Sequence, residues 1–106
     1  MKLSLNNKVK INNKTIGAEQ SAFVVVEIGV CHEQNIDVAK HFIDVAEENG
    51  ADAIKIEAFK ADKFVMDKNI LHKYGTAEGI IEENYYKLLK RLELSDEQII
   101  EIKKYA

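Results

Sequence analysis

Three charged side chains fall on two short apolar segments that are typical of β-strands. Glu27 interrupts the run VVVEIG, and Lys55 and Glu57 lie within AIKIEAF. Strand side chains alternate between two faces, so Lys55 and Glu57 share one face and the isoleucines beside them share the other. In parallel α/β sheets, ligands bind beyond the carboxyl ends of neighbouring strands. Two carboxylates and a cation at that place indicate either an anion-binding site or a salt bridge.

Other interpretations of these residues stay open. Glu27 and Lys55 could simply pair with each other across adjacent strands. A lysine on an inner strand could also form a Schiff base with a carbonyl substrate if burial tuned its pKa. The triplet Cys31, His32 and Glu33 suggests a metal site. Three consecutive residues at a strand end cannot easily face one ion, however, so we predict no metal ligand in this chain.

The two strand-like segments belong to a predicted βαβ unit. The apolar run at 22–28 indicates a strand buried on both faces, as in a parallel sheet. Apolar residues at helical spacing follow, with Asn35 as the expected N-cap and Gly50 at the expected C-terminus. The second strand comes directly afterwards, and a βαβ crossover of this kind is almost always right-handed. We therefore predict an α/β fold with a parallel sheet.

The flanking segments complete the predicted organisation. KVKINNKTIG alternates and turns at two asparagines, which predicts a β-hairpin within residues 1–20, ahead of a larger part at 21–106. Residues 60–79 show no clean period and are expected to form a long loop with one helical turn. Two helices should close the chain, at 80–92 and from Ser95, where SDEQ matches a capping box.

Composition excludes several classes of protein. The 106 residues are 46% hydrophobic, which is ordinary for a globular domain. The net charge of −3 and the absence of a basic stripe argue against nucleic acid as a partner. No apolar run approaches the ~18 residues of a membrane span, and the N-terminal segment lacks the apolar core of a signal peptide. A single cysteine excludes an internal disulfide, so we expect a cytoplasmic protein.

The stretch VEIGVCHEQ, followed by a helix and then GADAIKIEAF, resembles the opening βαβ of the sialic acid (N-acetylneuraminate) synthase family. The family pattern there is A-E-I-G-x-N-H-x-G, a helix, and G-A-D-A-x-K-x-Q. YYKLLKRLELSDEQ resembles the LLKKLELS helix pair of the same family. The resemblance implies an N-terminal hairpin followed by the first two βα units of a TIM (β/α)8 barrel.

The resemblance also implies a reaction and roles for three residues. Such enzymes condense phosphoenolpyruvate with an N-acetylated hexosamine-type sugar and release phosphate, giving a nonulosonic acid. Lys55 would hold phosphoenolpyruvate, Glu27 would lie beside the reacting centre and handle a proton or position water, and Glu57 would face the sugar. The family uses a divalent metal, manganese or magnesium, whose ligands would lie outside this chain. A homo-oligomer is expected.

Three positions depart from the family pattern. Cys31 replaces an asparagine, Gln34 replaces a glycine, and Glu57 replaces a glutamine, which changes a donor and acceptor into an acceptor only.

Length is the largest departure. A complete barrel needs about 250 residues, so we expect this chain to be a fragment of a synthase and to be inactive alone. The alternative is a non-catalytic short chain that acts as an oligomerising or interaction module through its open sheet.

Overall fold

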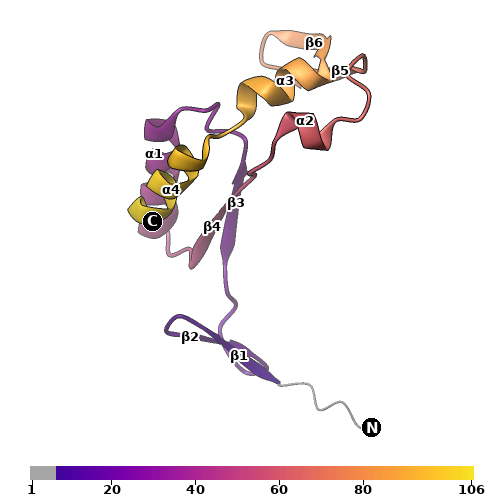
Figure 1. Ribbon diagram of the computed structural model, residues 1–106. Coiled ribbons are helices and arrows are strands. Elements are labelled where there is room, and N and C mark those ends of the chain that lie inside the picture. Colours follow the sequence, from indigo (N-terminus) through magenta and orange to yellow (C-terminus); the bar gives the residue numbers. More distant parts are fainter. Residues whose placement is uncertain (1–6) are drawn as a thin grey trace, which may run out of the picture.

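The computed structural model describes residues 7–106, and its centre is a parallel pair of strands. β3 (Val25–Gly29) and β4 (Ala53–Ile56) are joined by the crossover helix α1 (Ile36–Glu48) (Figure 1). The predicted βαβ unit is confirmed. None of the helices in the described residues is both long enough and apolar enough to span a bilayer.

Local sequence explains both ends of α1. The Asn35 side chain accepts hydrogen bonds from the backbone N–H groups of Asp37 (2.9 Å) and Val38 (3.3 Å), as an N-cap should. At the other end, Gly50 has a φ of +77°, the left-handed conformation that terminates many helices. The predicted capping residues of this helix are confirmed.

One face of the two strands is covered by α1 and α4 (Asp96–Tyr105), which lie side by side (Figure 1). The buried cluster consists of Ala39, Ile43, Leu94 and Ile102, with Ile36, Ile54, Ile56 and Ile99 packed against it. Helix α4 begins at the expected capping box, in which the Ser95 hydroxyl accepts from the Gln98 N–H and the Gln98 side chain accepts from the Ser95 N–H. Burial of the isoleucine face leaves Glu27 and Lys55 on the uncovered face.

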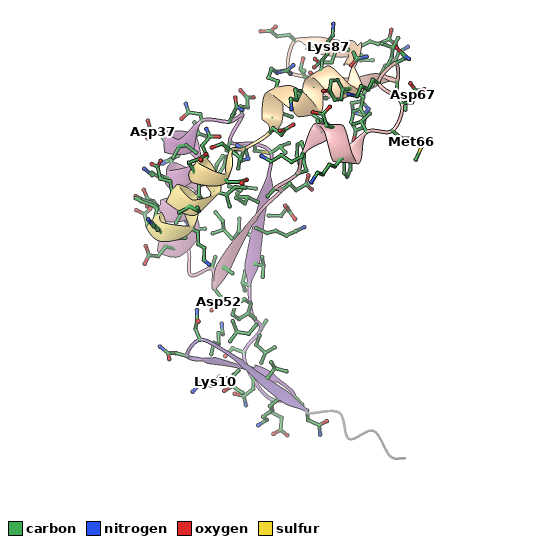
Figure 2. All side chains as sticks on the ribbon, viewed as in Figure 1. Lys10, Asp37, Asp52, Met66, Asp67 and Lys87 are labelled. Atoms are coloured by element: carbon green, nitrogen blue, oxygen red, sulfur yellow. The ribbon has the colours of Figure 1, made fainter. Side chains whose placement is uncertain are left out.

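The expected hairpin is present at the amino ends of the strands. β1 (Lys8–Ile11) and β2 (Lys14–Gly17) pair antiparallel, and residues 1–6 lie outside the described part. Lys14 Nζ lies 2.6 Å from the Asp52 carboxylate, which also accepts from the Val24 N–H (2.7 Å). Figure 2 shows Asp52 at this junction between the hairpin and the sheet. Both bonds stabilise the ionised carboxylate and lower the pKa of Asp52.

The predicted long loop at 60–79 is wrong beyond its single helical turn. That turn is α2 (Ala61–Phe64), and it is followed by an antiparallel hairpin of β5 (Leu71–Thr76) and β6 (Gly79–Asn84). The Thr76 hydroxyl accepts from the Glu78 N–H (3.2 Å) and donates to the Gly79 carbonyl (2.9 Å), so it organises a tight turn.

The helix predicted from residue 80 is too long at its start. Residues 80–84 belong to β6, and α3 runs from Tyr85 to Leu92. The Asn84 side chain accepts from the Lys87 N–H (2.9 Å), and this cap fixes the start of the helix one residue later. The apolar residues at helical spacing across 80–92 therefore belong partly to a strand and partly to a helix.

The expectation of a strand buried on both faces is also wrong for this chain. Val24 is 48% exposed and Val25 is 50% exposed, and only Ile28 of the run is buried. The sheet has two strands in the described residues, so one face and both edges lack cover.

A small lobe of α2, β5, β6 and α3 lies beyond the carboxyl ends of β3 and β4 (Figure 1). Its core consists of Ala61, Val65 and Leu89, with Phe59, Tyr85 and Tyr86 around them. The segment after α2 carries Met66, which projects into solvent and is fully exposed (Figure 2). The lobe therefore occupies the end of the sheet at which α/β proteins bind ligands.

Candidate functional site

The register of the central sheet brings two of the predicted residues together. Glu27 lies directly opposite Lys55 in the parallel ladder. Because side chains alternate along a strand, both project from the face that the helices leave uncovered. The Lys55 ammonium donates to the Glu27 carboxylate, so the mutual pair that the sequence left open is formed.

The backbone of β3 fixes the carboxylate of this pair. Glu27 Oε1 accepts a hydrogen bond from the Gly29 N–H (3.1 Å). Gly29 has a φ of +50°, a conformation that an L-residue adopts only with strain. The pairing register shifts between Glu27 and Gly29, which indicates an irregularity just before the strand ends. Glu27 is thus held by a donor on its own strand and by a cation on the next.

The third predicted residue lies just beyond the end of β4. The Glu57 N–H donates to the Gly29 carbonyl (3.1 Å), and the Glu57 side chain is exposed. The hydrogen bond and charge of Glu27 raise the pKa of Lys55, and the charge of Glu57 raises it further. Lys55 is therefore a stable cation at neutral pH. A Schiff-base nucleophile needs a neutral amine, so this environment argues against that interpretation.

The Glu27–Lys55 pair adds little to folding stability. The two side chains are 50% and 60% exposed, and exposed ion pairs are screened by water and salt. Its position on the uncovered face leaves both groups accessible to a ligand.

The turn after β3 is held in a strained conformation. Glu33 and Gln34 have φ values of +48° and +64°, which are unfavourable for residues other than glycine. The Gln34 N–H donates to His32 Nδ1 (3.0 Å), and its side-chain amide donates to the Glu93 carbonyl (2.5 Å). The positive φ at position 34 explains why the family pattern has a glycine there. In this chain a glutamine adopts the same conformation and is held by these hydrogen bonds.

His32 is buried in this turn and shapes it. Its side chain is fully buried, and Nε2 has no hydrogen-bond partner within residues 7–106. Because Nδ1 accepts from Gln34, the ring proton is assigned to Nε2. Burial disfavours the charged ring and lowers the pKa of His32. The neighbouring Cys31 thiol is exposed, and no cluster of three potential metal ligands occurs in the described part of the chain.

Sequence reasoning missed a pocket beside the strand ends. A cavity of about 600 Å³ lies between the turn after β3, strand β5 and helix α3. Its walls include Val30, Cys31, Glu33, Tyr74, Leu88 and Arg91. The alternating segment HKYGT and the glycine that ends TAEG would have revealed the hairpin that supplies Tyr74. No local signal in the sequence indicates that this hairpin meets the turn after β3.

The fold defines this chain as an α/β protein with a parallel sheet, a class whose members bind ligands beyond the carboxyl ends of the strands. A family model described as the NeuB family matches residues 42–106, and the chain belongs to that family. The family predicted from the βαβ motif is thereby confirmed.

Similar proteins include several sugar-acid synthases. An N,N'-diacetyllegionaminic acid synthase of Legionella pneumophila is 37% identical over 89 residues, which cover 83% of this chain and 25% of that protein. The human N-acetylneuraminate-9-phosphate synthase is 31% identical over 91 residues, which cover 86% of this chain and 25% of the relative.

The crystal structure of the spore coat polysaccharide biosynthesis protein SpsE of Bacillus subtilis superposes with a TM-score of 0.62. The two sequences are 29% identical, and the matched region covers 92% of this chain and 24% of the SpsE chain. The chain therefore spans about a quarter of the length of the relatives it matches.

The strained turn gives a prediction for stability. Gln34→Ala loses the bond to the Glu93 carbonyl and keeps a Cβ in the left-handed conformation, whereas Gln34→Gly loses the same bond and relieves the strain. The glycine variant should exceed the alanine variant in free energy of unfolding by about 1 kcal/mol. Urea denaturation of both proteins checks this order, and equal stabilities would contradict the strain argument.

The burial of His32 gives a prediction for pH. Its pKa in the folded state lies below the unfolded value of 6.5, so the unfolded chain binds the proton first. Stability should be complete above about pH 6.5 and decline as the pH falls below it. Urea unfolding at about pH 7.5 and about pH 5.5 should show a larger loss for the wild type than for His32→Gln. Identical losses would mean that the ring is not held neutral.

Proposed function

We propose that this chain supplies the first two βα units of a TIM barrel that condenses phosphoenolpyruvate with an N-acetylated hexosamine-type sugar. The reaction consumes water and releases phosphate, giving a nonulosonic acid. Membership of the NeuB family and the printed names of its synthase relatives support the reaction class. The half-exposed Val24 and Val25 support an incomplete barrel, since further strands would cover them.

One observation carries the proposal. Lys55 is a protonated cation on the uncovered face, next to the carboxyl ends of the strands, and it is oriented by Glu27. Phosphoenolpyruvate carries a carboxylate and a phosphate, both of which accept charge-assisted hydrogen bonds from an ammonium group. We assign the recognition of phosphoenolpyruvate to Lys55.

The two carboxylates take different roles in this proposal. Glu27 lies beside Lys55, and a carboxylate there can accept a proton or orient the water that the reaction consumes. Glu57 follows the strand end and its side chain is exposed, so its carboxylate is available to accept from a sugar hydroxyl. The resemblance to the family implies a manganese or magnesium ion whose ligands would lie outside this chain.

A second candidate is a non-catalytic interaction module. The exposed valines and the two uncovered edges of the central sheet favour association with another chain. Such a module would form a defined oligomer and release no phosphate from phosphoenolpyruvate, even with manganese present. A catalytic homo-oligomer, in contrast, would show both properties, so the phosphate assay separates the two candidates.

Removal of the cation should weaken phosphoenolpyruvate binding selectively. In the protein at its natural length, Lys55→Ala should raise the KM for phosphoenolpyruvate roughly ten- to a hundred-fold, the cost of a lost charge-assisted hydrogen bond. The KM for the sugar should change far less. Lys40→Ala is the matched control, because Lys40 also pairs with a glutamate but lies between the outer helices. An unchanged affinity for phosphoenolpyruvate would refute the role of Lys55.

A change at Glu57 should alter the sugar preference and leave the fold intact. Glu57→Gln restores a hydrogen-bond donor at the place where the family pattern has one. The ratio of kcat/KM values across a panel of N-acetylated hexosamines should shift, while the midpoint of urea denaturation stays constant. Loss of the folded state in this variant would instead identify Glu57 as part of a structural ion pair.

A further inference from the structure

The segments that follow β3 and β4 are joined where they leave the sheet. The Gly29 N–H donates to the Glu27 carboxylate (3.1 Å), and the Gly29 carbonyl accepts from the Glu57 N–H (3.1 Å). Gly29 therefore connects both carboxylates of the proposed reacting centre. From this junction one segment runs to Gln34 and the other runs to Ala61, where α2 begins. Connecting segments of this kind move independently unless their far ends are also held.

A single residue, Glu93, holds the far ends of both segments. Its backbone carbonyl accepts from the Gln34 side-chain amide (2.5 Å), and its carboxylate accepts from the Ala61 N–H (2.9 Å). Glu93 lies between α3 and α4 with an extended backbone, at a φ of −61° and a ψ of 132°. Residues 29–34, Glu93 and residues 57–61 thus form a closed ring of backbone and hydrogen bonds, which we call the frame.

The carboxylate end of the frame is shielded from water. The Glu93 side chain is 13% exposed, and Lys90 Nζ lies 3.1 Å from its carboxylate. The Ala61 N–H and the Lys90 ammonium stabilise the ionised form and lower the pKa of Glu93. Ala61 is fully buried, so removal of the carboxylate would leave its N–H without an acceptor. The frame therefore depends on the Glu93 side chain.

We propose that Glu93 is a positioning residue for the condensation, a role that rests on the proposed function. By holding both far ends of the frame, it fixes the distance between Glu27 on one strand and Glu57 after the other. Lys55 lies within β4 and is held by Glu27, so its contact with phosphoenolpyruvate does not depend on the frame. A misplacement of about 1 Å can cost about a hundred-fold in rate. Glu93 should therefore influence kcat rather than the affinity for phosphoenolpyruvate.

Kinetics on the natural-length protein test this role. Glu93→Ala should lower kcat about tenfold or more and leave the KM for phosphoenolpyruvate within about twofold of the wild type. Glu93→Gln keeps an oxygen that can accept from the Ala61 N–H, so it should retain most of the wild-type kcat. Asp52→Ala is the matched control, because Asp52 also accepts from a backbone N–H and from a lysine and is 18% exposed, but lies at the amino ends of the strands. It should lose stability and keep its kcat.

Hydrogen exchange tests the frame without a turnover assay. The Glu57 N–H belongs to the junction with Gly29, at the opposite end of the frame from Glu93. In Glu93→Ala this amide should exchange about tenfold faster than in the wild type, whereas Asp52→Ala should leave its rate unchanged. Gln34→Ala opens the frame at the carbonyl of Glu93 and should also speed this exchange, so it replaces Glu93→Ala if that variant does not fold. Unchanged exchange at Glu57 would mean that Glu93 only caps α2, and would overturn the inference.

The two measurements separate failure of this role from failure of the proposed function. An active enzyme in which Glu93→Ala keeps the wild-type kcat, or in which Asp52→Ala loses as much kcat, would overturn the positioning role. Absence of phosphate release by the wild type with every sugar would refute the proposed function. The exchange rate at Glu57 would still decide whether Glu93 holds the frame.

Discussion

The parallel pairing of β3 with β4 is the constraint on which the rest of the structure depends. It sets Glu27 opposite Lys55 and assigns the isoleucines of β4 to the opposite face. Parallel strands require a crossover, and α1 covers the isoleucine face together with α4. The same pairing therefore buries the apolar face and leaves the ion pair accessible. A shift of one residue in this register would exchange the two faces and remove both properties.

A short linker between α3 and α4 connects this sheet to the lobe at its carboxyl end. The Glu93 carbonyl accepts from Gln34, and its carboxylate accepts from the Ala61 N–H (2.9 Å). Lys60 donates to the carbonyl of Leu94 (2.9 Å), and the Leu94 side chain is buried among the helices. These bonds hold the turn after β3, the start of α2 and the helix pair together. The lobe is thereby fixed over the strand ends, where it forms one side of the pocket beside the turn after β3.

Local sequence patterns predicted the helices whose ends are capped by residues close to them in the sequence. The cap at Asn35, the left-handed Gly50 and the capping box at Ser95 depend on neighbours within a few positions, so the sequence reveals them. The alternation of β4 likewise predicted which face would carry Lys55. The β5–β6 hairpin was missed because its isoleucines also fit a helical spacing, and the cap at Asn84 decides between the two. Arg91 and the Tyr74 hydroxyl both donate to the Glu83 carboxylate. These bonds depend on that hairpin, so they could not be predicted without it.

We propose that the uncovered face of the sheet binds phosphoenolpyruvate through Lys55. A crystal structure of the natural-length protein with phosphoenolpyruvate tests it most directly. We expect a carboxylate or phosphate oxygen of the ligand within hydrogen-bond distance of Lys55 Nζ, with Glu27 still on the same side of the sheet. Ligand density elsewhere, with the Glu27–Lys55 pair undisturbed, would show that the pair is structural and would contradict the account.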